Sequence, residues 1–206
     1  MIHKHEIIKY GGIALIAGSI LALVADVVGI LVVEDHNPIR QTVSQLAHGK
    51  YAYIQDIGLA LFGVGILIAG ATLYLWKSDA FKCEWGATLL SIMGICIVVL
   101  AEFNEFAGTP GTTVHIVLAV FIGVLFMLCT FLIGLAFKKI NKNWYYASIG
   151  MGILFLVSCS GFLVISQAYQ GAYERGVIQI VLIWFCAMGY QMIKYPEKTM
   201  DFETFK

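Results

Sequence analysis

The sequence predicts an all-α integral membrane protein, a polytopic bundle of six transmembrane helices, and three observations support this. Of its 206 residues, 60% are hydrophobic and only 13% are charged, whereas soluble domains are usually about half apolar and a quarter charged. Six apolar runs reach or approach the roughly 20 residues that a helix needs to cross the hydrocarbon. These runs also lack the alternating pattern of barrel strands, so only helices can satisfy their backbone polar groups.

The six spans are predicted from the limits of the apolar runs. The first run covers residues 10–33. It is longer than the apolar region of a signal peptide and no small-residue cleavage site ends it, which indicates a retained transmembrane helix. The other spans are expected at about residues 57–76, 85–103, 113–137, 144–166 and 177–193. Residues 1–194 would form a single membrane domain, and residues 195–206 a polar cytoplasmic tail.

The distribution of basic residues predicts the orientation. Six spans place both termini on one side, and connections that face the cytoplasm are enriched in lysine and arginine. The side of the termini carries Lys4, Lys9, Lys77, Lys82, Lys138, Lys139, Lys142, Lys194, Lys198 and Lys206. The opposite side carries only Arg40, Lys50 and Arg175. We therefore expect a multi-pass protein of the plasma membrane with its N- and C-termini in the cytoplasm.

The long connection at residues 34–56 is predicted to contain a short amphipathic helix. Asn37 and Pro38 are typical of an N-cap followed by the first helical residue. Apolar residues then recur at helical spacing between polar ones, at Ile39, Val43, Leu46 and Ala47. Such a helix would lie over the end of the bundle or flat on the lipid interface.

Four short segments, taken in order, resemble one protein family. They are Thr42–Ala47 (TVSQLA), the acidic end of the third span, His115 at the start of the fourth, and Gly171–Arg175 (GAYER) at the start of the sixth. The chain resembles the six-helix membrane proteins of domain-of-unknown-function family 998 over nearly its whole length. The resemblance implies an integral membrane protein whose polar motifs cluster at one face, and it implies no activity.

Asp26 is the clearest single candidate for a functional residue. It lies about 10 Å below the outer end of the first span, given a rise of 1.5 Å per residue. A buried carboxylate there must be protonated or paired, because hydrocarbon strongly disfavours charge. Asp26 is therefore either a proton site, metal ligand or general base, or a structural link to a partner such as Arg175.

His115 and Glu102 are the other two candidate catalytic residues. Glu102 ends the third span and can orient the imidazole of His115, which would tune its protonation near neutral pH. The alternative is a hydrogen-bonded structural histidine. Glu105, in the connection after Glu102, is interpreted as a solvated loop charge.

Glu174 and Arg175 open the last span and are candidate ligand-binding residues. Glutamate is favoured in a first helical turn by the helix dipole, which explains Glu174 without a ligand. Arginine is disfavoured there unless an anion holds it. That anion can be Asp26 or Glu102 in a structural ion pair, or a lipid phosphate gripped by the guanidinium.

Ser44 is a further candidate, because Ser44 and His48 are four residues apart and would share one face of the predicted helix. Serine–histidine catalysis needs the serine Oγ within hydrogen-bond reach of the imidazole, and it also needs a donor for the oxyanion, which spacing does not show either. Spacing does not establish that contact, and the polar face of an interfacial helix is the plainer interpretation.

The sequence gives little information about cofactors and partners. Zinc or another divalent metal would need several converging ligands. His36, His48, His115, Asp26 and Glu102 share the outer side, but none has the spacing of a metal motif. The chain has no basic patch for nucleic acid, so membrane lipid is the expected partner.

Three functions are compatible with these observations. The first is a hydrolase or transferase that acts on a lipid in a polar pocket at the extracytoplasmic end, and we favour it because ionisable residues converge there. The second is a protein that binds or transports a small solute or protons past Asp26. The third is a non-catalytic membrane interaction subunit in which the polar cluster only locks the helices together.

Overall fold

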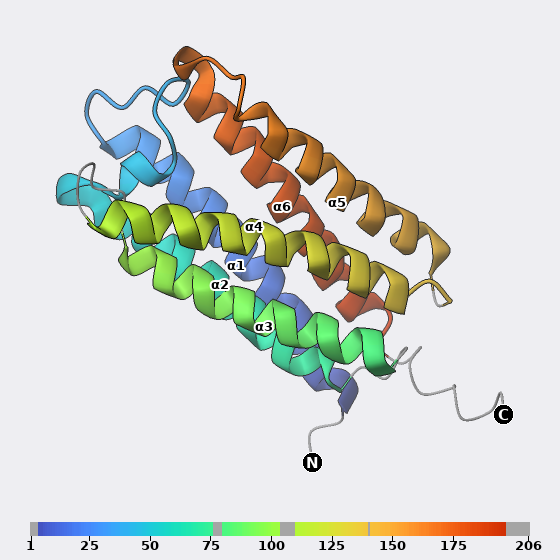
Figure 1. Ribbon diagram of the computed structural model, residues 1–206. Coiled ribbons are helices and arrows are strands. Elements are labelled where there is room, and N and C mark those ends of the chain that lie inside the picture. The colour runs from blue at the N-terminus through green and yellow to red at the C-terminus, as the bar shows by residue number, and fades with distance from the viewer. Residues whose placement is uncertain (1–3, 76–79, 104–109, 140, 197–206) are drawn as a thin grey trace, which may run out of the picture.

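The computed structural model describes residues 4–75, 80–103, 110–139 and 141–196, and all the regular structure in these ranges is helical (Figure 1). Glu105 and residues 197–206 of the tail lie outside the described residues. The long helices are α1 (Lys4–Val32), α2 (Ala52–Leu73), α3 (Ala80–Glu102), α4 (Pro110–Ala136), α5 (Lys142–Gly161) and α6 (Gln170–Lys194). Three short 3₁₀ helices are η1 (Ser44–Ala47), η2 (Gly49–Tyr51) and η3 (Gln167–Tyr169).

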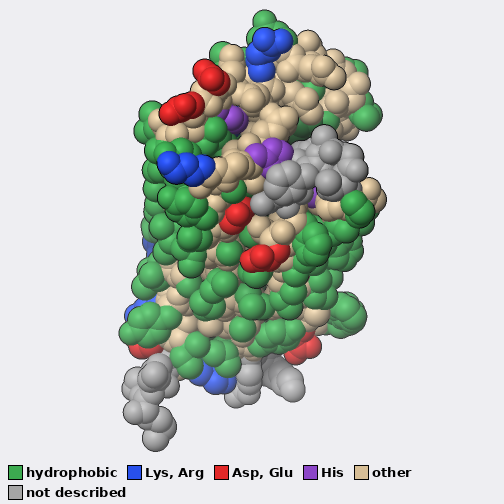
Figure 2. Space-filling view, turned by 90° about the vertical axis from the view of Figure 1, so that its left-hand side faces the viewer, with side chains coloured by type: hydrophobic (Ala, Val, Ile, Leu, Met, Phe, Trp, Pro, Cys, Tyr) green, Lys and Arg blue, Asp and Glu red, His purple; other side chains and the backbone are tan. Residues whose placement is uncertain are grey.

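All six long helices are long and apolar enough to cross a membrane, which confirms the predicted six-helix membrane architecture. Large apolar side chains point away from the protein on several helices: Leu31 is 78% exposed, Val120 64% and Val157 64%. Figure 2 shows the same arrangement on one face, where hydrophobic side chains cover the middle of the molecule. A surface of this kind would contact lipid, because water disfavours so much contiguous apolar area.

The six helices form a closed ring. Each helix contacts the next one along the chain, and α6 returns to contact α1. The chain termini share one end of the bundle, which we call the terminal end (Figure 1). At the opposite end α1, α3 and α5 finish and α2, α4 and α6 begin; we call this the mouth end.

Glycine allows the closest helix contacts in the ring. A Cβ atom on Gly94 in α3 would lie 2.7 Å from the carbonyl oxygen of Gly63 in α2. A Cβ atom on Gly12 in α1 would lie 2.6 Å from the carbonyl oxygen of Gly189 in α6. In lipid, where burial of apolar surface does not drive association, such close backbone approach favours helix packing.

An aromatic cluster fills the middle of the ring. Phe126 of α4 and Trp184 and Phe185 of α6 are among the largest fully buried side chains. The rings of Phe126 and Trp184 meet edge-on at 5.4 Å between centroids, and those of Phe62 and Phe185 at 5.3 Å. Edge-on contacts of this kind are favourable because the positive ring edge meets the negative ring face.

Helices α4 and α5 are buried only toward the terminal end. The buried residues of α4 lie between Leu125 and Ala136, and those of α5 between Trp144 and Phe155. Toward the mouth end the two helices diverge (Figure 1). A cavity lined by residues of α4, α5 and α6 lies at this end of the bundle.

The observed helices extend beyond the predicted spans at several ends. Helix α1 begins at Lys4 instead of residue 10, and α6 begins at Gln170 instead of residue 177. The prediction followed the apolar runs, whereas helical hydrogen bonds continue into polar sequence outside the hydrocarbon. Helix α5 is shorter than expected, because residues 162–164 form turns.

Candidate functional site

A cavity of about 260 Å³ opens within the mouth end of the bundle. Its walls are mostly apolar, and its floor includes the aromatic side chains of Phe62, Phe126, Phe155 and Phe185. Polar side chains also line it: Asp26, Ser44, Gln55, Asp56, His115, Glu174, Arg175 and Gln179. An apolar pocket with a few converging polar groups is the usual form of a small-molecule site.

Ser44 and His115 form a hydrogen-bonded pair at the wall of this cavity. Ser44 Oγ lies 3.0 Å from His115 Nε2, and His115 Nδ1 lies 2.7 Å from the carbonyl oxygen of Phe103. A carbonyl oxygen can only accept, so Nδ1 must carry a proton. In the neutral imidazole Nε2 is then an acceptor, and the hydroxyl of Ser44 donates to it. This is the tautomer that a general base needs to take a proton from serine.

Three elements bring this pair together. Ser44 is the first residue of η1, and η1 is anchored by Leu46, which is 1% exposed and packs beside Gly29 of α1. His115 lies in the second turn of α4, and Phe103 follows directly after the last residue of α3. Ser44 therefore comes from the long loop, and its base, His115, comes from α4 and lies 71 residues later in the sequence.

Glu102 does not line the cavity. It is exposed at the last position of α3. The sequence suggests that Glu102 orients His115, whereas in the structure His115 Nδ1–H donates to the backbone carbonyl oxygen of Phe103, the next residue. A backbone carbonyl can orient the imidazole as a carboxylate does, but it carries no full charge to stabilise an imidazolium.

Asp26 and Arg175 form an ion pair between α1 and α6. Arg175 Nε lies 3.2 and 3.1 Å from the two carboxylate oxygens of Asp26, and Nη2 lies 3.1 Å from Oδ1. Both side chains are only 14% exposed. Asp26 lies six residues before the end of α1, about 9 Å along the helix. The pair neutralises a carboxylate that would otherwise be strongly disfavoured at this depth.

The remaining donors of Arg175 hold the loop that follows α1. Nη1 donates to the carbonyl oxygens of Pro38 and Gln41, each at 2.8 Å. The Ala172 N–H of α6 also donates to the Ile39 carbonyl oxygen at 3.0 Å. These three carbonyl groups therefore bond to α6 and not within a helix of their own.

This contact with α6 explains why the predicted amphipathic helix is not seen. Residues 38–40 form a turn, residues 41–43 are not helical, and only η1 and η2 follow before α2. Asn37 does act as a local cap, since its Oδ1 accepts from the N–H groups of Ile39 and Arg40. The turn that it begins ends at once, because the carbonyl oxygens of Pro38 and Gln41 accept from Arg175.

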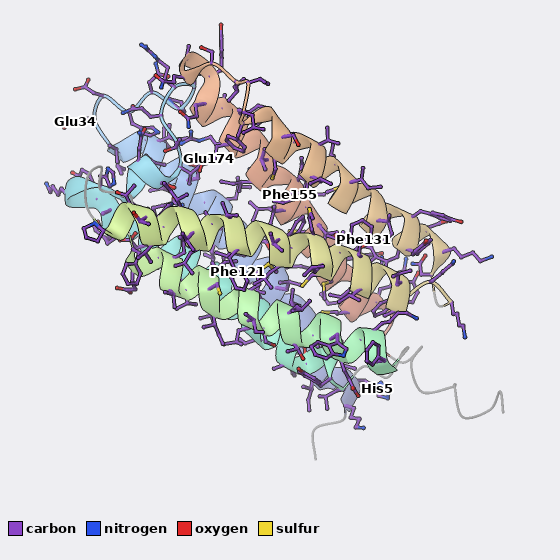
Figure 3. The ribbon with its side chains drawn as sticks, in the orientation of Figure 1. His5, Glu34, Phe121, Phe131, Phe155 and Glu174 are labelled. Atoms are coloured by element: carbon purple, nitrogen blue, oxygen red, sulfur yellow. The ribbon has the colours of Figure 1, made fainter. Side chains whose placement is uncertain are left out.

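Glu174 fixes the residue before Ser44. Its Oε2 accepts a hydrogen bond of 2.8 Å from the N–H of Val43. Figure 3 shows Glu174 near the start of α6, at the mouth end and beside the loop that follows α1. It lies far from His5, which is at the terminal end. Glu174 and Arg175, adjacent in sequence, therefore both hold the loop that carries Ser44.

The structure thus places five of the six predicted site residues around one cavity, and leaves Glu102 outside it. Sequence reasoning did not identify Gln55 or the Phe103 carbonyl. Gln55 is a polar residue just before the second span predicted at residues 57–76. The sequence therefore places it in the connection at residues 34–56. A backbone carbonyl leaves no signal in a sequence.

His36 adds a titratable group to the Arg175 network. Its Nε2 lies 3.2 Å from Arg175 Nη2, and a guanidinium can only donate, so Nε2 is unprotonated here. Burial, followed by the positive charge of Arg175, lowers the pKa of His36 below its usual 6.5, although Asp26 opposes this. Protonating His36 would place a second cation beside Arg175.

We expect the stability of the protein to fall in mild acid because of His36. Its pKa is lower in the folded than in the unfolded chain, so the unfolded chain binds more protons as the pH falls below about 6.5. The stabilising contribution of His36 is complete above that pH and is lost toward its lower folded pKa. The unfolding temperature should therefore drop between about pH 7.5 and pH 5.5 more in the wild type than in His36→Gln. Equal drops in both proteins would contradict this.

Gly171 is required where α6 meets the loop. A Cβ atom there would lie 2.1 Å from the Gln41 carbonyl oxygen and 2.8 Å from that of Pro38. We expect Gly171→Ala to destabilise the protein by about 1–3 kcal/mol, as overpacking does. Gly176→Ala in the same helix is the control, since a Cβ atom at Gly176 meets nothing within 4 Å. Thermal unfolding in detergent measures both, and equal unfolding temperatures would refute the prediction.

The residues that the structure describes contain no group of three or more histidine, cysteine, aspartate or glutamate side chains that could hold a metal ion. Asp26 is engaged by Arg175, and His115 by Ser44 and Phe103. The zinc alternative therefore gains no support from the geometry of these residues.

Comparison with known proteins identifies one match. A sequence model of the family described as "Protein of unknown function (DUF998)" matches residues 16–191, which is most of the chain and runs from within α1 to within α6. No curated protein and no solved structure matches the chain.

Proposed function

We propose that this chain, which belongs to the DUF998 family of proteins of unknown function, is a lipid-directed hydrolase or transferase that reacts through Ser44 and His115. The observation that carries the proposal is the hydrogen bond of 3.0 Å between Ser44 Oγ and His115 Nε2 at the wall of a cavity. A serine hydroxyl that donates to an imidazole of fixed tautomer is the arrangement of an activated nucleophile.

The reaction would be acyl transfer. Ser44 Oγ attacks the carbonyl carbon of the substrate while its proton moves to His115 Nε2. The bond from the acyl carbon to the leaving group then breaks, and His115 returns the proton to the leaving oxygen or nitrogen. Water releases the acyl group from Ser44 in a hydrolase, and the hydroxyl of a second substrate accepts it in a transferase.

Three features support a lipid as the substrate. The cavity is mostly apolar, so it suits an acyl chain better than a polar solute. Its lining includes Ile122 of α4 and Phe155 of α5, and these two helices diverge toward the mouth end. The surrounding surface would itself contact lipid, so a membrane lipid needs no aqueous step to reach the cavity.

The proposed location of the site is the extracytoplasmic face of the plasma membrane. The mouth end carries few basic residues, and the terminal end carries most of the lysines. Under the positive-inside rule the terminal end would face the cytoplasm. Ser44 and His115 would then act on lipids of the outer leaflet.

A transport function is less well supported than acyl transfer. The cavity ends on Phe62, Phe126, Phe155 and Phe185, and Phe126 and Phe185 contact each other at 5.9 Å between centroids. A solute or proton path to the terminal end would have to cross this aromatic layer. Asp26, the residue suggested for such a path, is engaged in an ion pair with Arg175.

A non-catalytic role is the second candidate, and the Asp26–Arg175 ion pair favours it. In that case the polar residues at the mouth end only hold α1, α6 and the loop together. Asp26→Asn would then lower the unfolding temperature without a separate loss of function. The Ser44–His115 pair joins the loop to the part of α4 that has no buried residues, so it contributes little to the packed core of the bundle.

The experiment that tests the proposal uses the full-length protein in detergent or in vesicles. A fluorophosphonate probe should label Ser44, located by peptide mass spectrometry, because such probes react with activated serines. Release of radiolabelled acyl chains from mixed phospholipid and lysophospholipid vesicles measures turnover. Absence of both reactions in a folded protein would overturn the proposal.

A further inference from the structure

Gln55 is a buried polar residue in the wall of the cavity. It is the fourth residue of α2, it is 7% exposed, and it lines the same cavity as Ser44 and His115. The Ser44–His115 chemistry does not use it.

The side-chain oxygen of Gln55 has no hydrogen-bond partner among the described residues, although it is shielded from solvent. His5 Nδ1 and Thr42 Oγ1 are also shielded without a partner, but neither residue lines the cavity. The other polar side chains buried as deeply as Gln55 are bonded: Ser19, Thr72 and Thr130 each donate to a carbonyl oxygen of their own helix, and Ser148 donates to Thr130 of the neighbouring helix. A buried acceptor without a donor is costly and therefore rare.

We infer that Gln55 selects the substrate by accepting a hydrogen bond from it, and this inference rests on the proposed function. Gln55 Oε1 can only accept, and the oxygen atoms of an ester also only accept. A lipid that offers only ester oxygens to Gln55 would leave the amide oxygen unpaired in the occupied cavity. The substrate class is therefore a lipid that carries a donor, a hydroxyl or an amide N–H, close to the acyl carbonyl.

This class includes lysophospholipids, whose free hydroxyl neighbours the acyl ester, and N-acyl lipids, whose N–H is part of the acyl amide. Diacyl lipids without either group are excluded by the same argument. Sites built to bond a substrate hydroxyl or N–H discriminate strongly against analogues that lack it, because the buried polar group of the protein is then left unpaired.

Binding to the Ser44→Ala protein tests the inference without turnover. The first pair of probes is a 1-acyl-2-hydroxy lysophospholipid and its 2-O-methyl ether, which differ only in the donor. The second pair is an N-acyl amine lipid and its N-methyl analogue. We expect the donor lipid of at least one pair to bind about ten- to a hundredfold more tightly than its methylated partner. The pair that shows this difference in affinity tells whether the donor is a hydroxyl or an amide N–H.

Gln55→Met, added to the same background, should remove this difference by weakening the donor lipid. Gln170→Met is the matched control, since Gln170 is exposed at the start of α6, and it should leave the difference unchanged. Equal binding within both pairs by the protein with Gln55 overturns the inference. That comparison uses the protein that keeps Gln55, so the inference can be tested even if Gln55→Met fails to fold.

The outcomes separate this inference from the proposed function. If the Ser44→Ala protein binds none of the four lipids, the proposed function fails and the inference fails with it. If the probes bind equally within each pair while wild type releases acyl chains, only the role of Gln55 is wrong. If Gln55→Met in a protein that keeps Ser44 lowers the rate of acyl release from both members of a pair equally, Gln55 serves the reaction and not selection, which also overturns the inference.

Discussion

Replacing His115 with alanine should lower the rate of acyl release, and of fluorophosphonate labelling at Ser44, by about 10²–10⁴-fold. The physical reason is the loss of the base that accepts the Ser44 proton, because Nε2 is the atom that Ser44 Oγ contacts. Ser44→Ala should abolish labelling at this position and acyl release together. Rates are measured on protein that elutes as a single peak and unfolds cooperatively, so that loss of folding is not read as loss of chemistry.

Two variants control for this prediction. Ser160→Ala removes an exposed hydroxyl at the mouth end that bonds only to the Leu156 carbonyl oxygen of its own helix, and it should keep the wild-type rate. His48→Ala tests the pairing suggested by the spacing of Ser44 and His48, and it should also retain activity. Full activity in His115→Ala would exclude His115 as the base, and loss of activity only in His48→Ala would transfer that role to His48.

Replacing Arg175 with methionine should lower the free energy of unfolding by about 3–5 kcal/mol, the usual result of removing one partner of a buried ion pair. The variant leaves the Asp26 carboxylate without its cation at 14% exposure. It also removes the donors to Pro38 and Gln41. Thermal and denaturant unfolding in the same detergent measures the loss.

Arg40→Met is the matched control, because Arg40 lies in the same loop with an exposed side chain and should change stability by less than about 0.5 kcal/mol. Asp26→Asn should be destabilising but milder than Arg175→Met, since an amide oxygen still accepts from the guanidinium. Unfolding of Arg175→Met at the wild-type temperature would show that the ion pair does not hold the mouth end.

The sequence predicts the six helices well because each apolar run corresponds to the hydrocarbon thickness. The ends of the helices are less well predicted. Residues 170–176 precede the apolar run that begins at residue 177, yet they form the first two turns of α6, where Glu174 and Arg175 bond to the loop. Residues 38–48 have helical periodicity, yet the carbonyl groups of Pro38 and Gln41 bond to Arg175 and that of Ile39 bonds to the N–H of Ala172.

Some contacts of the candidate site could likewise be predicted from the sequence, and others could not. Asp26 was expected to need a partner, with Arg175 among the candidates, since hydrocarbon disfavours an isolated charge. The pairing of Ser44 with His115 was not expected, because the spacing between Ser44 and His48 suggested a different partner. Glu102 was expected to orient His115, but the Phe103 carbonyl does so, and no pattern of side chains predicts a backbone contact.

By itself, the sequence determined that this is a six-helix membrane protein. The few ionisable residues within its predicted spans, Asp26, Glu102 and His115, all lie toward one end, because charge is costly in hydrocarbon. The tertiary structure alone decided which residues they contact. Contacts between segments about 70 to 150 residues apart, such as Ser44 with His115 and Asp26 with Arg175, depend on how the helices close into a ring. The physical reason is that a hydrogen bond requires a specific distance and direction, which composition and periodicity do not encode.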